Sequence, residues 1–114
     1  MYNLSQEEEA CLQACLECAS ACEYCATACL SEEMVGMMVD CIRSCRDCAD
    51  TCSLCARLMA RHSDLDAEMC RLCATACEIC AEECGRHDHE HCQQCAAACR
   101  KCAEACRKVA EAAA

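Results

Sequence analysis

Cysteine occupies 21 of the 114 positions in this chain, and its spacing constrains the fold more than any other feature. Within four separate stretches the cysteines recur at alternating steps of three and four residues. This rhythm places every member of a stretch on one stripe of an α-helix, where an ordinary bundle carries leucine. The four stretches contain Cys11, Cys15, Cys18, Cys22, Cys25 and Cys29; Cys41, Cys45, Cys48, Cys52 and Cys55; Cys70, Cys73, Cys77, Cys80 and Cys84; and Cys92, Cys95, Cys99, Cys102 and Cys106.

The segments around these stripes predict four helices. The chain has no proline and only two glycines, while alanine is abundant, so its composition favours helix. Capping residues set the expected starts: a capping box of Ser5 with Glu8, an N-cap at Ser31, a second capping box of Ser63 with Asp66, and a cap at Asp88. The expected ends are about Leu30, about Arg61, Gly85 in a C′ role, and about Glu111.

Short connections between long helices force sequential neighbours to run antiparallel. The sequence therefore predicts an all-α, antiparallel up-down-up-down four-helix bundle with a cysteine-lined core, formed by a single domain over residues 1–114.

Charge and composition exclude several classes of function. The formal net charge is −10, whereas a nucleic-acid-binding surface needs a basic footprint. No uncharged stretch approaches the roughly 18 residues of a transmembrane helix. The first residues carry neither a basic region nor an apolar run, so no export signal is expected and a cytoplasmic location is predicted. Cytosolic thiols are kept reduced, and the odd cysteine count leaves one unpaired in any all-disulfide scheme, so metal binding is favoured.

Thiols at this spacing are suited to a soft metal ion. Cysteines three or four residues apart on a helix have β-carbons about 5–6 Å apart, so two thiolates can converge on one ion. Thiolates select Cu(I), Zn(II) or iron–sulfur clusters. Cu(I) accepts two or three sulfurs, whereas Zn(II) wants four, and the stripes contain no isolated set of four. If each thiolate bridges two Cu(I) ions, up to roughly twenty ions would bind per chain, compared with about five tetrahedral Zn(II) ions.

The two ends of the bundle differ in their expected ligands. At the end with the first and third connections, four further candidate metal ligands extend the thiol stripes, namely Met34, Met38, His87 and His91. His89 lies nearby in sequence. The other end is continued by Leu4, Met59, His62 and Val109. We therefore expect the first end to be the entrance for metal and the second to be an apolar plug, although Met59 and His62 are also potential ligands.

The chain resembles the bacterial four-helix-bundle copper storage proteins of the cytosolic type. The resemblance rests on the repeated CxxC and CxxxC spacings of all four stretches and on the segment Gly85-Arg-His-Asp-His-Glu-His-Cys, and it covers essentially the whole chain. It implies that many Cu(I) ions bind down the core and that His and Met residues handle ions at the open end. It also implies a homotetramer and exchange of copper with donor or acceptor proteins.

Two other functions stay open at this point. One is sequestration of zinc or cadmium, which counting bound Cu(I) and Zn(II) ions would separate from copper storage. The other is a thiol-disulfide oxidoreductase, since Cys-x-x-Cys pairs at a helix start can exchange disulfides. That motif usually accompanies a βαβ pattern, and the sequence contains no strand pattern. No thiol is distinguished from its neighbours as a nucleophile, so we expect a protein that is not an enzyme.

Overall fold

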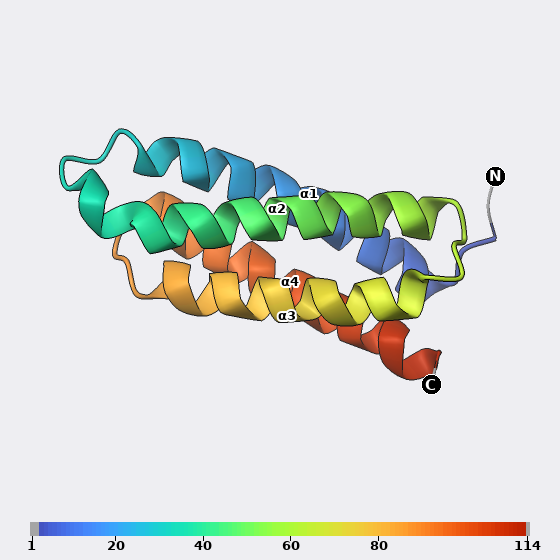
Figure 1. Cartoon of the computed structure of the whole chain (residues 1–114). Helices are drawn as coiled ribbons and strands as arrows, with labels where there is room; N and C mark the ends of the chain where they lie inside the picture. The colour runs from blue at the N-terminus through green and yellow to red at the C-terminus, as the bar shows by residue number, and fades with distance from the viewer. Residues whose placement is uncertain (1–2, 114) are drawn as a thin grey trace.

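The computed structural model describes residues 3–113, which form four long helices. These are α1 (Gln6–Cys29), α2 (Val39–Ala60), α3 (Asp66–Gly85) and α4 (Glu90–Ala112), with a short 3-10 helix, η1 (Val35–Met38), before α2. Successive helices run in opposite directions, so both termini lie at the same end of the bundle (Figure 1). The predicted up-down-up-down bundle is confirmed.

The helices form a ring in chain order. α1 packs against α2 and α4, and α3 packs against the same two helices, so α2 and α4 face each other across the bundle axis. The bundle is a rod of 47 × 23 × 18 Å. One end carries the connections 30–38 and 86–89, and the other carries the connection 61–65 with the termini (Figure 1). None of the described helices combines the length and the apolarity needed to cross a bilayer.

The core is made of sulfur and methyl groups. Each of the 21 cysteines is at most 1% exposed. The other buried residues are chiefly the alanines flanking the stripes, such as Ala74 and Ala96, which are fully buried. Small side chains there let helix backbones approach closely, and this closeness brings thiols of different helices into contact. Within residues 3–113 no polar or charged side chain is buried.

The start of α1 is capped as predicted. The Glu8 N–H donates to Ser5 Oγ at 3.1 Å, and the Ser5 N–H donates to Glu8 Oε1 at 2.8 Å. This reciprocal pair satisfies two of the backbone N–H groups that a helix start leaves without partners.

The predicted start of the second helix at Ser31 is wrong. Residues 30–34 form turns, and α2 begins only at Val39 after η1, with no side-chain cap. The N–H groups of Ser31 and Glu32 donate to the carbonyls of Ala28 and Cys29 at 3.0 and 3.2 Å, which closes off α1 with tight turns. Gly36, a poor helix former, lies in the connection, and Met38 is buried at its end. The connection therefore folds over the end of the bundle.

Three further predictions about the ends of helices are also wrong. Ser63 accepts a bond from the Leu65 N–H at 3.1 Å, forming a local turn, so α3 begins one turn later without a side-chain cap. Gly85 lies inside the last turn of α3 with negative φ, and Arg86 closes the helix in right-handed geometry. Asp88 does not cap α4; His89 precedes it, and Gln93 Nε2 fixes the connection by donating to backbone carbonyls.

Candidate metal centre

The cysteine sulfurs form one continuous array through the bundle. All 21 thiols are free, and the contacts between sulfurs of different helices measure 3.3–4.0 Å, far beyond the roughly 2.05 Å of a disulfide. Contacts within one helix are similar, for example 3.9 Å between Cys18 and Cys22. Every thiol therefore has a partner on another helix, and one pair on each helix is also in contact along that helix.

Sulfur–sulfur contacts lead from one end of the rod to the other without a gap. Every step is between 3.3 and 3.9 Å, and most steps change helix. The path runs through Cys92, Cys41, Cys84, Cys45, Cys95, Cys22, Cys99, Cys48, Cys52, Cys102, Cys106 and Cys11.

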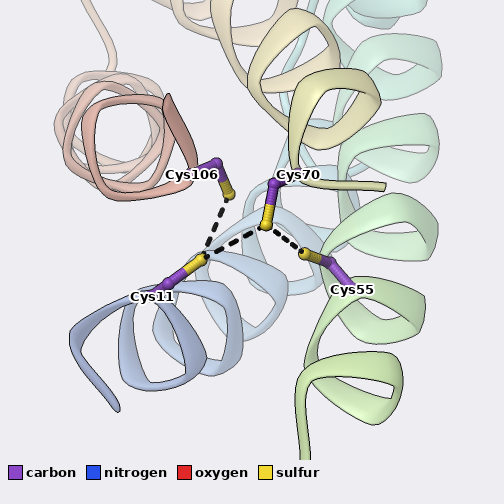
Figure 2. Close-up of side chains that lie close together, drawn as sticks. All are labelled: Cys11, Cys55, Cys70 and Cys106. Carbon is purple, nitrogen blue, oxygen red and sulfur yellow. Dashed lines mark hydrogen bonds between the residues drawn. The ribbon is translucent and has the colours of Figure 1, made fainter. Parts of the chain in front are cut away.

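The structure also assembles groups of four thiols, which the linear spacing concealed. One such group lies at the end with the connection 61–65, and its members come from four different helices and point toward a common centre (Figure 2). They are Cys11, Cys55, Cys70 and Cys106. Three of their sulfur–sulfur distances are 3.6, 3.8 and 4.0 Å. A tetrahedron with metal–sulfur bonds of about 2.3 Å has edges of about 3.8 Å, so this geometry alone admits a four-coordinate ion.

These groups of four share members. Cys55 and Cys106 also belong to a second group, with Cys15 and Cys73. Independent tetrahedral ions cannot occupy both groups at once, whereas ions bridged by shared thiolates can. The arrangement therefore favours a cluster of low-coordinate ions over separate four-coordinate sites.

Hydrogen bonds within the array shift the pKa values of neighbouring thiols in opposite directions. Contact with Cys106 lowers the pKa of Cys11 to about 5 and that of Cys102 to about 6. The contact with Cys102 in turn raises the pKa of Cys106 and of Cys15. Metal uptake must therefore displace protons from the thiols whose pKa is raised.

At the end with the connections 30–38 and 86–89, here called the open end, one imidazole reaches the thiols. His91 Nδ1 lies 3.3 Å from the sulfur of Cys25 and 3.5 Å from that of Cys92, and these two sulfurs are 3.9 Å apart. The three atoms form a triangle of two sulfurs and one nitrogen, which suits a three-coordinate soft ion. Burial lowers the pKa of His91, but its hydrogen bonds to Cys25 and Glu32 outweigh that effect and raise the pKa above its ordinary value.

The other three predicted entrance residues are placed differently. Met38 is buried against the core at 2% exposure, whereas Met34 is 66% exposed. The His87 ring is bonded through Nε2 to Glu83 Oε2 at 2.8 Å and reaches no sulfur among its hydrogen-bond partners. Met34, Met38 and His87 border a hollow of about 480 Å³ beneath the connection 30–38, together with Met37 and His89. These residues are gathered at the same end as His91, and His91 is the predicted entrance residue that hydrogen-bonds to thiols.

Glu32 belongs to this end of the bundle, and sequence reasoning did not identify it. Its Oε2 atom lies 2.8 Å from His91 Nε2 and 3.5 Å from His89 Nδ1. No spacing rule pointed to this contact, because it depends on how the irregular connection folds.

The opposite end is an apolar plug, as expected. Met59 is fully buried, and Met69 and Val109 are each 7% exposed. His62 is exposed, and its Nε2 atom lies 3.4 Å from the Asn3 carbonyl, so its ring faces away from the sulfurs.

Comparison with known proteins agrees with this architecture. The family described as "Copper storage protein" matches residues 4–111. No curated protein sequence gives a significant match.

Several solved structures are similar to the chain. The Cu(I)-bound copper storage protein BsCsp3 is 50% identical, with a TM-score of 0.88, covering 92% of this chain and 99% of its own. The apo form of copper storage protein 3 from Bacillus subtilis is 49% identical, with a TM-score of 0.84 and coverages of 90% and 97%. The copper storage protein of Streptomyces lividans, loaded with 10 copper equivalents, is 39% identical, with a TM-score of 0.92 and coverages of 97% and 93%.

The matched span includes α1, α2 and α3, all of α4 except its last residue, and every thiol of the array. The sulfur-lined bundle and the family match therefore lead to one conclusion: this chain belongs to the copper storage protein family.

Proposed function

We propose that residues 1–114 act as one cytosolic storage domain that holds many Cu(I) ions, up to roughly twenty per chain, on its core thiolates. The observation that carries this proposal is the array of 21 free, buried sulfurs, in which neighbouring sulfurs are 3.3–4.0 Å apart. Low-coordinate Cu(I) can use every one of these sulfurs, because neighbouring ions share thiolates. The role is that of a metal store and not of an enzyme.

The charge of the ion also supports copper. In water-excluding surroundings a group of bare thiolates is strongly unfavourable, and the chain already carries a net charge of −10. Monovalent ions in roughly equal number to the thiolates neutralise the core. Four thiolates around each Zn(II) would leave two negative charges per ion buried in it. The sequestration of zinc or cadmium is therefore the less favourable use of the same array.

Ions enter, in this proposal, at the end that carries His91. Cys25, Cys92 and His91 Nδ1 offer three ligands to the first ion, within 3.3–3.9 Å of one another. Met34, Met38 and His87 border the hollow outside this triangle and present thioether and imidazole groups to arriving ions. An ion then moves inward by exchanging one thiolate for the next along the sulfur path, so the bundle need not open.

The proposed ligands are accordingly the 21 cysteines, with Met34, Met38, His87 and His91 serving the entrance. The direct test is an anaerobic titration of the reduced protein with Cu(I) and, separately, with Zn(II), followed by metal analysis. We expect about twenty Cu(I) ions per chain and few tightly held Zn(II) ions. Binding of only about five ions of either metal would contradict the proposed mode of storage.

Assembly into a homotetramer, implied by the family resemblance, is a further part of the proposal. It is supported by exposed apolar side chains along α2 and α3: Leu54 is 42%, Leu72 56% and Ile79 59% exposed. Leu72 and Ile79 border a groove of about 520 Å³ between the two helices. Light scattering after size exclusion should give about four times the chain mass of 12.4 kDa, and a Leu72→Glu variant should dissociate. Copper donors and acceptors would then approach the His91 end.

A further inference from the structure

At the open end, three side chains that are not part of the thiol array converge on one point. Glu32 Oε2 lies 2.8 Å from His91 Nε2 and 3.5 Å from His89 Nδ1. The two imidazole rings are stacked in parallel, with centroids 5.4 Å apart and planes 3° apart. Glu32 comes from the connection 30–38, His89 is the last residue before α4, and His91 lies in the first turn of that helix.

The donor set differs in kind from the core. Two imidazole nitrogens and one carboxylate oxygen suit borderline divalent ions such as Zn(II), whereas soft Cu(I) is selected by sulfur. The three side chains are partly exposed, at 27% for Glu32, 42% for His89 and 13% for His91. Water can therefore complete the coordination of an ion held there. One carboxylate leaves such an ion with a net charge of +1, favourable beside Glu33 and Glu90 on a chain of net charge −10.

We propose that Glu32, His89 and His91 form a site for a divalent cation of the Zn(II) class, separate from the thiolate core. The ion binds Glu32 Oε2 and His91 Nε2, and it binds His89 Nδ1 once the stacked His89 ring turns toward it. It replaces the hydrogen bond that now joins His91 to Glu32 and ties the connection 30–38 to α4.

The site also competes with Cu(I) for His91. A neutral imidazole has one lone pair, so a divalent ion on Nε2 leaves the proton on Nδ1. Nδ1 is the atom that faces Cys25 and Cys92, at 3.3 and 3.5 Å. His91 therefore serves either the divalent ion or Cu(I) at the entrance. When the imidazole is not available, Cu(I) stays bound to the two thiolates, because two-coordinate binding suits this ion.

The test uses reduced protein saturated with Cu(I), so that the core thiols are already occupied. Zn(II) is added, loosely bound metal is removed by dialysis, and zinc and copper are counted per chain. We expect one retained Zn(II) ion in the wild type and a loss of at least tenfold in Zn(II) affinity in His89→Ala and Glu32→Gln. Glu83→Gln and His62→Ala, which remove a nearby carboxylate and a distant imidazole, should retain the ion.

Copper counts and far-UV circular dichroism of the same samples show whether each variant is folded and loaded. Equal zinc retention in the wild type, His89→Ala and Glu32→Gln would overturn the proposal, as would no retained zinc in the wild type. A chain that takes up few Cu(I) ions would contradict storage instead. In that case the imidazole ¹⁵N shifts of copper-free protein still test the divalent site. Zn(II) should shift His89 Nδ1 and His91 Nε2 in the wild type, and unchanged shifts would overturn it.

Discussion

The Nδ1 atom of His91 lies 3.3 Å from the sulfur of Cys25, so an imidazole from α4 reaches the thiol stripe of α1 at the mouth of the bundle. This contact is where the polar surface meets the sulfur core. An ion entering by the proposed route would meet nitrogen and sulfur there together. It is also the place where substitutions should alter the movement of copper without altering the store behind it.

Replacing His87, His89 and His91 together with alanine should slow Cu(I) uptake or release several-fold while leaving capacity near that of the wild type. The core thiols, which set capacity, are untouched by these substitutions. Stopped-flow absorbance of the copper–thiolate bands gives the rates, and metal analysis gives the capacity. His62→Ala, at the opposite end, is the matched control. Equal fractional losses of rate and capacity would contradict the assignment of the entrance.

The copper-free protein should be most stable near pH 8.5 and should lose stability toward an acid limit and an alkaline limit. The pKa of Cys102 is lowered to about 6, so its contribution to the free energy of unfolding is complete above the ordinary thiol pKa, declines as pH falls below it, and is lost once pH reaches about 6. The pKa values of Cys15 and Cys106 are raised, so their contribution is present below the ordinary thiol pKa of about 8.5 and is lost above it. Thermal unfolding from pH 5 to pH 10 checks both limits.

Bound copper should abolish the alkaline loss of folding stability but not the acid loss. Copper-bound thiolates carry no proton, so the alkaline loss of stability should disappear in the loaded protein. Protons compete with Cu(I) for sulfur, so the acid loss should remain and be accompanied by release of copper. A loaded protein that destabilises above pH 9 as steeply as the copper-free form would show that the thiols are not the ligands.

Ser5→Ala should destabilise the protein by about 1 kcal/mol, because it removes half of the capping box at the start of α1. Ser31→Ala is the matched control: Ser31 makes no side-chain cap, so its replacement should change the free energy of unfolding by less than about 0.5 kcal/mol. Urea denaturation of the copper-free variants measures both values. Equal effects of the two substitutions would indicate that α2 starts at Ser31 in solution.

Ala96→Leu should cost about 1–3 kcal/mol and reduce copper capacity. Ala96 is fully buried beside the sulfur array, so a larger side chain pushes the helices apart and separates thiols that share an ion. Ala97→Leu, at the adjacent exposed position, should alter neither property. Denaturation and metal counting distinguish the two variants. Full copper capacity in a folded Ala96→Leu protein would show that close helix approach is not needed for loading.

Sequence reasoning predicted the helical stripes well because alternating steps of three and four leave one geometric solution. Every cysteine from Cys11 to Cys106 is buried as that pattern requires. The groups of four, such as Cys11 with Cys55, Cys70 and Cys106, were not visible, because they depend on the relative heights of four helices.

The ends of the helices were predicted less well, for a local reason. Ser31, Ser63 and Asp88 have the chemistry of caps, but Ser31 and Ser63 are bonded in local turns instead. No side-chain cap bond is present at the start of α4, where Asp88 was expected to supply one. The fold of the connection 30–38 also decides where Glu32 lies, so its contact with His91 had no signature in the spacing of residues. Regular periodicity determined the cysteine-lined core, whereas irregular backbone determined the geometry of the end that carries His91.

The sulfur contacts between α2 and α4 cross the axis of the bundle, as between Cys48 and Cys99 at 3.8 Å or Cys45 and Cys95 at 3.7 Å. An ion shared by such a pair fastens the first helical hairpin to the second. A protease that unfolds its substrates from one end would have to break many of these metal–thiolate bonds in turn. A filled chain should therefore outlast an empty one during protein turnover, and its lifetime would report how much copper it holds.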